Sequence, residues 1–142
     1  MEVDRNGLEV LTRDECLRLL GTAVLGRIAV STSVPTILPV NFHFDGSRIL
    51  VRTGRGTKLD AAIRNAVVAF EVDDVDPLSH AGWSVVVTGV ARELTDPDEL
   101  AETRRRPLAR WAPGPDDRVI AISTVMVSGR RIVPGLGLAR QR

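Results

Sequence analysis

The sequence predicts a mainly β protein: a six-stranded antiparallel β-barrel with three short helices at its periphery. The chain of 142 residues is 44% hydrophobic and has no Tyr, so the core must be built from Val, Ile, Leu and Ala, and the branched residues favour strands. Strand-like segments do not alternate regularly with helical ones, which excludes a doubly wound parallel sheet. Between two such segments, Asp45-Gly46 is a strong hairpin signal.

Six segments have the β-branched composition and alternation expected of strands. They are residues 26–32, 35–44, 47–52, 67–72, 83–94 and 118–130. Pro39 lies inside the second segment and has no backbone N–H to donate. This strand must therefore lie at a sheet edge or contain a bulge.

Three segments have helix-start signals. Thr12 and Glu15 match a capping box, which predicts a short helix after Thr12. A second helix is expected over about residues 57–65, where apolar residues recur at core-facing spacing. A third is expected to begin at residues 95–98, with Pro97 near its first position.

Composition limits the class of protein. The net charge of +1 creates no field for nucleic acid or an anionic membrane, so neither partner is expected. The single Cys16 rules out an internal disulfide and fits a reducing compartment. No signal peptide begins the chain, no apolar run approaches the ~20 residues of a membrane span, and His and Cys lack metal-site spacing. We expect a cytoplasmic single domain over residues 1–142, with irregular tails at residues 1–11 and 134–142.

The segment Arg52-Thr53-Gly54-Arg55-Gly56-Thr57-Lys58 carries the most information about a site. It leaves a strand, passes two glycines and enters a helix, so its backbone can approach an anion and meet it with unpaired amides. Arg52, Arg55 and Lys58, the only lysine among 19 basic residues, add cations. Spacing alone supports a phosphate site and a plain turn capped by Thr57 equally well.

Further motifs surround this segment in a characteristic order. They are GRIA at residues 26–29, LPVNF at 38–42, the Asp45-Gly46 hairpin, the run from 52 to 74 ending in FEVDD, and WSVVVTGVA at 83–91. Over residues 12–95 this order resembles the pyridoxamine 5'-phosphate oxidase-like family of FMN-binding split barrels. The resemblance implies a split barrel with FMN bound at the interface of a homodimer.

The resemblance also implies a set of cofactor-binding residues. Those implied at the flavin phosphate are Arg52, Thr53, Thr57 and Lys58. Those implied along the edge of the isoalloxazine ring are Pro39, Val40 and Asn41, with a backbone N–H near Val40 or Asn41 directed at N5. Those implied to reach the partner's flavin are Trp83 and Ser84. Arg27, if it turns inward, would stabilise negative charge at the pyrimidine end of the ring.

These observations favour an FMN-dependent oxidoreductase with a small-molecule redox substrate or a nicotinamide donor. The pyridoxal phosphate-binding segment of the true oxidase has no counterpart in residues 125–142, so that oxidase activity is not implied. One alternative is a reductase that uses the deazaflavin F420, whose polyglutamate tail could meet Arg104–Arg106. Another is a non-catalytic protein that binds flavin or haem, the latter through His43 or His80 as axial ligand.

Overall fold

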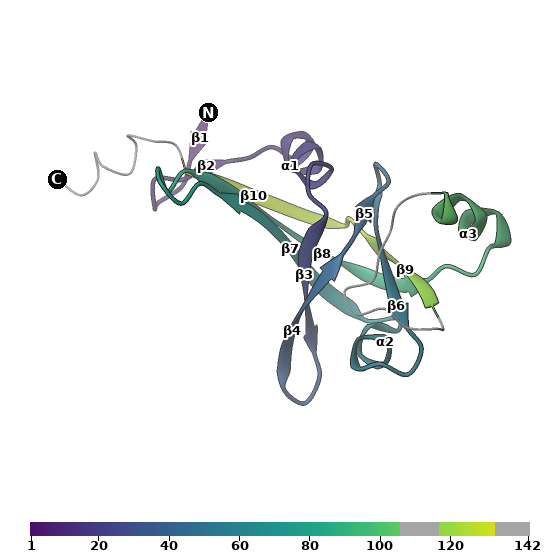
Figure 1. Ribbon diagram of the computed structural model, residues 1–142. Coiled ribbons are helices and arrows are strands. Elements are labelled where there is room, and N and C mark those ends of the chain that lie inside the picture. The colour runs from purple at the N-terminus through teal and green to yellow at the C-terminus, as the bar shows by residue number, and fades with distance from the viewer. Residues whose placement is uncertain (106–116, 133–142) are drawn as a thin grey trace.

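The computed structural model describes residues 1–105 and 117–132, which form ten strands and three helices (Figure 1). The helices are α1 (Arg13–Leu20), α2 (Lys58–Ile63) and α3 (Pro97–Arg104). The strands are β1 (Glu2–Val3), β2 (Glu9–Val10), β3 (Leu25–Ser31), β4 (Pro35–Asn41), β5 (His43–Phe44), β6 (Arg48–Gly54), β7 (Val67–Val75), β8 (Gly82–Glu93), β9 (Asp117–Ser123) and β10 (Met126–Ile132). None of the helices in these two ranges is long and apolar enough to cross a membrane.

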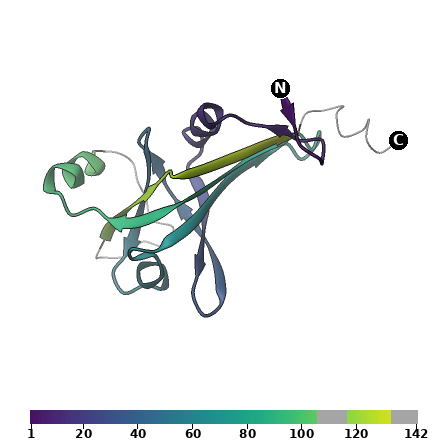
Figure 2. The same ribbon diagram turned by 180° about the vertical axis from the view of Figure 1, so that it is seen from behind.

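All strand pairs in the described residues are antiparallel, as the sequence predicts. One path runs β1-β2-β10-β8-β7-β3-β4, and β9, β6 and β5 join it through β8. The two outermost strands of the barrel, β4 and β5, are not paired with each other in this topology. The sheet therefore curls without closing, which is a split barrel (Figure 2). β4, which contains Pro39, is an edge strand, as predicted.

β8 joins the two parts of the sheet. Its Gly82–Thr88 segment pairs with β10, and its Ala91–Glu93 segment pairs with β9. Gly89 lies between these segments, and a Cβ atom there would overlap the carbonyl group of Ser123. The Ser123 hydroxyl accepts a hydrogen bond from the N–H of Val90 at 2.9 Å, so the end of β9 lies closely against β8 at this point.

The core fills the barrel because alternate residues of each strand point inward. The largest fully buried hydrophobic side chains are Phe70, Leu20, Ile28, Ile49, Ile63, Ile120, Ile122, Val51, Val72, Val85 and Val87. Phe70 packs edge-to-face on Phe42, with ring centroids 4.9 Å apart. A Cβ atom on Gly26 would overlap the Phe70 ring, so this glycine lets β3 lie against the aromatic core.

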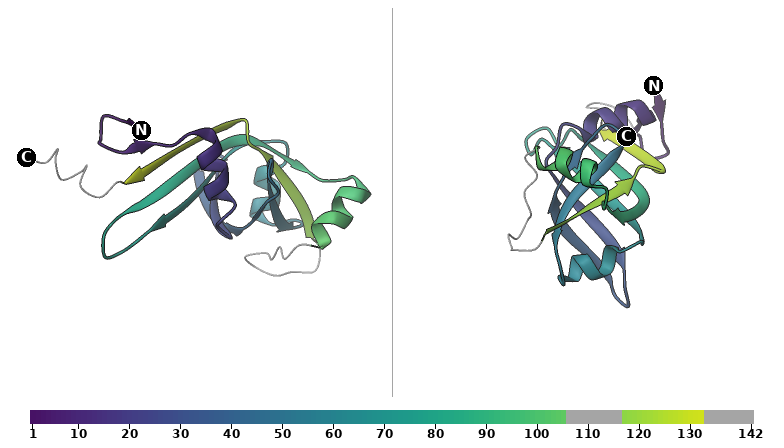
Figure 3. Two further views of the ribbon diagram at one scale, coloured as in Figure 1. Left: turned by 90° about the horizontal axis from the view of Figure 1, so that it is seen from above. Right: turned by 90° about the vertical axis from the view of Figure 1, so that its right-hand side faces the viewer.

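Beyond the barrel, β7, β8 and β10 continue as an arm that also carries β1 and β2 (Figure 3). α1 lies over the part of the arm nearest the barrel, and α3 lies at the opposite end of the molecule. Cys16 of α1 is fully buried, as expected of a helix core residue. Its sulfur would be 2.7 Å from a Cβ atom on Gly129, so the absent side chain at Gly129 allows α1 to approach β10.

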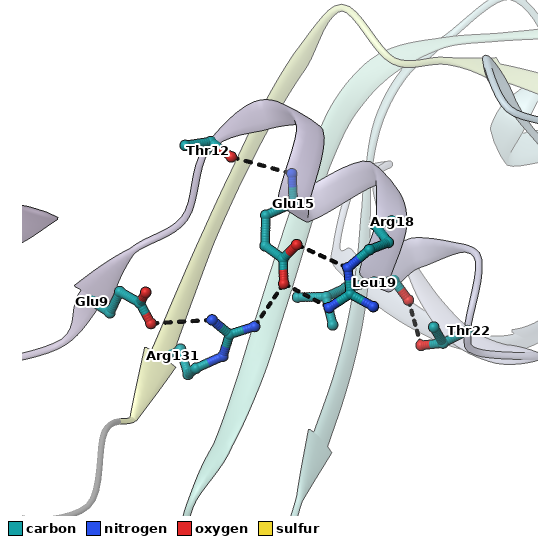
Figure 4. Close-up of polar contacts among 7 residues, drawn as sticks. All are labelled: Glu9, Thr12, Glu15, Arg18, Leu19, Thr22 and Arg131. Atoms are coloured by element: carbon teal, nitrogen blue, oxygen red, sulfur yellow. Dashed lines mark hydrogen bonds and ion pairs between the residues drawn. The ribbon is translucent and has the colours of Figure 1, made fainter. Parts of the chain in front are cut away.

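α1 is fixed to the arm by its first turn (Figure 4). The Thr12 hydroxyl accepts a hydrogen bond from the N–H of Glu15 at 3.2 Å, which confirms Thr12 as the N-cap. The Glu15 carboxylate accepts hydrogen bonds from Arg18 at 2.6 and 2.8 Å and from Arg131 of β10 at 2.8 Å. Arg131 also donates to Glu9 at 3.1 Å. The hydrogen bonds from Arg18 and then Arg131 lower the pKa of Glu15 to about 2.

The structure corrects the expected strand boundaries. Residues 35–44 form two strands rather than one, because β4 pairs with β3 whereas β5 pairs with β6. Residues 118–130 also belong to two strands, β9 and β10, because they pair with different segments of β8. The Asp45-Gly46 hairpin is confirmed, with Gly46 at φ +101° and antiparallel pairing of β5 and β6.

The sequence led us to expect an irregular tail at residues 1–11. The structure corrects this expectation, because two short strands form there. β1 pairs with β2, and β2 pairs with β10, so this segment extends the arm by two short strands. Asp4 stabilises the turn between them because its carboxylate accepts N–H bonds from Asn6 at 2.9 Å and Leu8 at 3.0 Å. The other expected tail, residues 134–142, lies outside the described residues.

Candidate functional site

The turn between β6 and α2, residues 52–60, is built around two threonine hydroxyls. Thr53 is buried, and its hydroxyl lies 3.2 Å from that of Thr57. Thr57 is the N-cap of α2: its hydroxyl donates to the carbonyl of Gly54 at 2.8 Å and accepts from the N–H of Asp60 at 3.1 Å. Gly56 has φ +78° with open space where a Cβ atom would be, so the backbone conformation requires glycine here. The capped turn is thus confirmed, and phosphate binding there stays a prediction.

Asp60 is the residue at this turn that our sequence-based reasoning missed. Its side chain is 2% exposed, and its carboxylate accepts a hydrogen bond from the N–H of Gly56 at 2.9 Å. Two arginines balance its charge, Arg64 and Arg118, each with a nitrogen 3.5 Å from a carboxylate oxygen. The signal was present in the sequence, because Thr57-Lys58-Leu59-Asp60 follows the same Thr-x-x-acid pattern as the start of α1.

The four residues implied as phosphate ligands do not all gather at one point. Thr53 and Thr57 meet at the β6–α2 turn. Arg52 is the neighbour of Thr53 on a strand, so its side chain leaves the opposite face of β6. There it lines a cavity of about 590 Å³ together with Arg55 and Arg118. Lys58 is the first residue of α2, and its side chain lies outside the described part of the structure.

A groove lies between the β3–β4 hairpin and α2, which stand beside each other in Figure 1. Its volume is about 370 Å³. Its walls are formed by Val30, Thr32, Thr36, Leu38, Ala61 and Ala62. α2 forms one wall of this groove, and the same helix begins at the β6–α2 turn with Thr57 as its N-cap.

The implied ring-contact residues on β4 have different surroundings. Val40 is buried in the core, Asn41 is half-buried, and Pro39 is exposed and stands opposite Arg27 of β3 in the register. The side chain of Arg27 does not turn into the barrel. It donates a hydrogen bond to Glu71 of β7 at 2.9 Å on the opposite face of the sheet.

Arg27, Glu71 and Asp73 form a charged cluster on this outward face. Arg27 also lies 3.6 Å from Asp73. Burial and the neighbouring Asp73 carboxylate raise the pKa of Glu71, while the Arg27 guanidinium acts in the opposite direction. Exposed hydrophobic side chains surround the cluster on the same face, which we call the outer face. They are Leu25, Ile37, Val67, Val86 and Met126.

Trp83 and Ser84 lie near the start of β8, which belongs to the arm, whereas α2 lies at the barrel (Figure 1). Trp83 is half-buried against the main core, and Ser84 points to the opposite face. The two histidines are also apart. His43 on β5 has a buried Nε2 atom without a hydrogen-bond partner, whereas His80 is exposed in the β7–β8 loop with φ +59°. Of the expected Arg104–Arg106 run, Arg106 lies outside the described residues.

Comparison with known proteins decides the family. The model of the pyridoxamine 5'-phosphate oxidase family matches residues 12–131. The chain belongs to this family. The resemblance seen in the sequence and the split barrel are therefore both confirmed, and the family match extends past the segment in which we recognised motifs.

Several known proteins are similar to this chain over most of their length. An uncharacterized protein of Mycobacterium tuberculosis is 41% identical over 129 residues, which cover 87% of this chain and 84% of the relative. The structure of an FAD-binding protein from Mycobacterium smegmatis is 38% identical, covers 87% of this chain and 96% of its own, and has a TM-score of 0.76. A conserved protein of unknown function from Corynebacterium diphtheriae is 31% identical, with 89% and 99% coverage and a TM-score of 0.73.

Proposed function

We propose that this protein binds a flavin nucleotide in the groove between the β3–β4 hairpin and α2, and that it is a flavin-dependent oxidoreductase. The observation that carries the proposal is that α2, which forms one wall of this groove, begins at the turn that holds the Thr53 and Thr57 hydroxyls. The 38% identity to an FAD-binding protein from Mycobacterium smegmatis supports a flavin as ligand. The sequence predicts FMN as the cofactor, and this similarity adds FAD as a second cofactor to test.

The groove suits the two chemical parts of a flavin. Leu38, Ala61 and Ala62 give it apolar walls that can contact the flat isoalloxazine ring. β4 is an edge strand, so its backbone can pair with the polar edge of the ring, as the implied roles of Pro39, Val40 and Asn41 require.

At the other end of the groove, Thr53, Thr57 and Lys58 would hold the phosphate. The negative charge of Asp60 is balanced by Arg64 and Arg118, which lie beside its carboxylate. Asp60 therefore does not repel the phosphate with an uncompensated charge.

Flavin, when bound, supplies the electron and hydride transfer, and the protein binds and orients it. The proposed reaction partner is a nicotinamide or another small redox molecule.

We further propose that the protein acts as a homodimer through the outer face. One row of residues crosses the outer face from β4 to β10. In order of the strands β4, β3, β7, β8 and β10, it consists of Ile37, Ala29, Ala69, Thr88 and Met126. Ile37 is 68% exposed and Met126 is 65% exposed, which is unusual for large apolar residues on one sheet face. A partner that covered this face would also bring its arm, with Trp83 and Ser84, toward a flavin in the other protomer.

Flavin titration of the purified protein tests the cofactor proposal directly. FMN, FAD, F420 and haem are added separately while flavin fluorescence and the visible spectrum are recorded. We expect FMN or FAD to bind with quenched fluorescence and to be reduced by NADH or NADPH under anaerobic conditions. Preference for F420 would reassign the cofactor, and a Soret shift with haem alone would contradict the proposal.

A groove-filling variant tests the location. Ala61 is exposed and lines the groove, so Ala61→Phe is expected to leave the melting temperature unchanged and to weaken flavin binding by tenfold or more, about 1.4 kcal/mol. Ala101→Phe, at an exposed position of α3, is the matched control and should bind flavin normally. Equal flavin affinity in the two variants would place the ring elsewhere.

The dimer is tested by a charge on the outer face. Val86→Arg is expected to convert a dimer into a monomer in light scattering and to weaken flavin binding with it, because a buried unpaired charge is costly. Leu78→Arg, in the exposed β7–β8 loop, is the control. A wild-type monomer would contradict the proposed assembly.

A further inference from the structure

A second cavity lies on the other face of β6, between that strand, β9 and α3. Its volume is about 590 Å³, which is within the range of small-molecule sites. It is lined by residues different from those of the groove between the β3–β4 hairpin and α2. Arg52 and Arg55, which lie at the β6–α2 turn or next to it, line the second cavity.

The second cavity has an excess of positive charge. Among the described residues, three guanidinium groups line it, those of Arg52, Arg55 and Arg118, together with the carboxylate of Glu93. Asp60 and Glu93 each lie 3.5 Å from a nitrogen of Arg118. Even so, its buried Nε has no hydrogen-bond partner, so the ion pair with Asp60 does not satisfy it. An anionic ligand would therefore meet several donors that can turn toward it.

The far wall of the second cavity is apolar. Leu94, Leu100 and Val119 belong to a small hydrophobic cluster that is separate from the main core. Thr95 adds an exposed hydroxyl at the rim. A cationic entrance beside an apolar wall with a few polar groups matches a ligand that has a phosphate at one end and a flat heterocycle at the other.

The second cavity lies beside the β6–α2 turn, where the phosphate of the proposed flavin would bind, because Arg52 and Arg55 line it. Thr53 and Arg52 are adjacent on β6 and leave opposite faces of the strand, and Arg55 lies in the turn between them and Thr57. FMN has one phosphate and would end at the turn. FAD has a second phosphate and an adenosine that must continue past it.

We propose that the second cavity binds the adenosine and the distal phosphate of FAD, with Arg52 and Arg55 at the phosphate and Leu94, Leu100 and Val119 against the adenine. This inference rests on the proposed function, since it assumes the flavin phosphate at the β6–α2 turn. It identifies FAD rather than FMN as the cofactor that the protein retains.

Affinity for FAD, FMN and ADP, measured by calorimetry on the full chain, tests this site. The wild type is expected to bind FAD at least ten times more tightly than FMN, and ADP is expected to compete with FAD. Leu100→Trp fills the apolar end and should weaken FAD binding about tenfold while FMN binding stays within about twofold. Arg55→Gln, at an exposed residue, should weaken FAD binding more than FMN binding.

Matched controls separate the local effect from a general one. Leu78→Trp and Arg92→Gln change exposed residues that do not line the second cavity and should leave both affinities unchanged. Equal binding of FMN and FAD, or equal losses of both in Leu100→Trp, would overturn the adenosine site and leave flavin binding intact. If neither flavin binds the wild type, the proposed function itself fails.

Discussion

Two helices of this protein begin with the same four-residue pattern and use it differently. In α1 the pattern is Thr12 to Glu15, and in α2 it is Thr57 to Asp60. Each threonine is the N-cap, and its hydroxyl accepts the N–H three residues on, at 3.2 Å in α1 and 3.1 Å in α2. The acids differ: the Glu15 side chain is 29% exposed, whereas that of Asp60 is 2% exposed.

The difference shows that a local pattern can determine where a helix begins but not what the acid contacts. α1 lies on the arm, so Glu15 meets the surface arginines Arg18 and Arg131. α2 lies against the barrel, where Asp60 meets Arg118, which stands opposite Thr53 in the β6–β9 register, as well as Arg64 of its own helix end. The acid of α2 therefore becomes part of the proposed binding turn, and the acid of α1 becomes a link between helix and sheet.

Of the changes that test this difference between the two helices, removing the charge of Asp60 should have the largest effect on stability. Asp60→Asn leaves the buried Arg118 charge with Glu93 as its remaining ion-pair partner and weakens the bond to Gly56, so we expect the free energy of unfolding to fall by about 3 kcal/mol. Urea unfolding followed by circular dichroism measures it. Asp98→Asn, at an exposed acid in the first turn of α3, is the control and should cost less than about 1 kcal/mol. A loss for Asp60→Asn as small as the control's would mean that water already solvates Arg118.

The positions of these acids could not be predicted from the sequence, although the helices could. Thr12 and Thr57 mark helix starts through bonds within one turn, and Pro97 does so through its fixed φ at the first helical position. All three helices begin where those residues predict. The Asp45-Gly46 hairpin is equally local. Contacts between distant segments carry no such signal.

The same limit explains the broken strands and the divided site. That residues 118–130 form two strands depends on where β8 changes partner, which only the folded sheet decides.

Arg52 and Thr53 are neighbours in sequence, so they looked like two ligands of one phosphate. Strand alternation sends them to opposite faces of β6, and this could have been anticipated from the period of two.

The two N-cap threonines give the next largest effect. Thr12→Ala removes one capping bond and should cost about 1 kcal/mol. Thr57→Ala also removes the bond to the Gly54 carbonyl and the contact with the Thr53 hydroxyl, so about 2 kcal/mol is expected. Thermal unfolding of both variants compares them, with Thr→Ser at each position expected to restore most of the loss. Equal losses at the two sites would show that the additional Thr57 bonds add nothing to stability.

The smallest effect is expected for Glu15, and pH reveals it. The pKa of Glu15 is about 2 in the folded protein, against an ordinary value of 4.5, because Arg18 and Arg131 bind the charged form. The stabilisation is therefore complete above the ordinary pKa and is lost as the pH falls through the folded value. Glu15→Gln should flatten the decline of stability in this acidic range and lower neutral stability by the same amount, which is small because the pair is exposed and screened by salt. Urea unfolding at a series of pH values, with Asp14→Asn as the matched control on the same helix turn, distinguishes this link from general charge. An unaltered pH profile in Glu15→Gln would mean that Arg18 and Arg131 bind the carboxylate no better than water does. The two acids, Glu15 and Asp60, would then differ only in how deeply their side chains are buried.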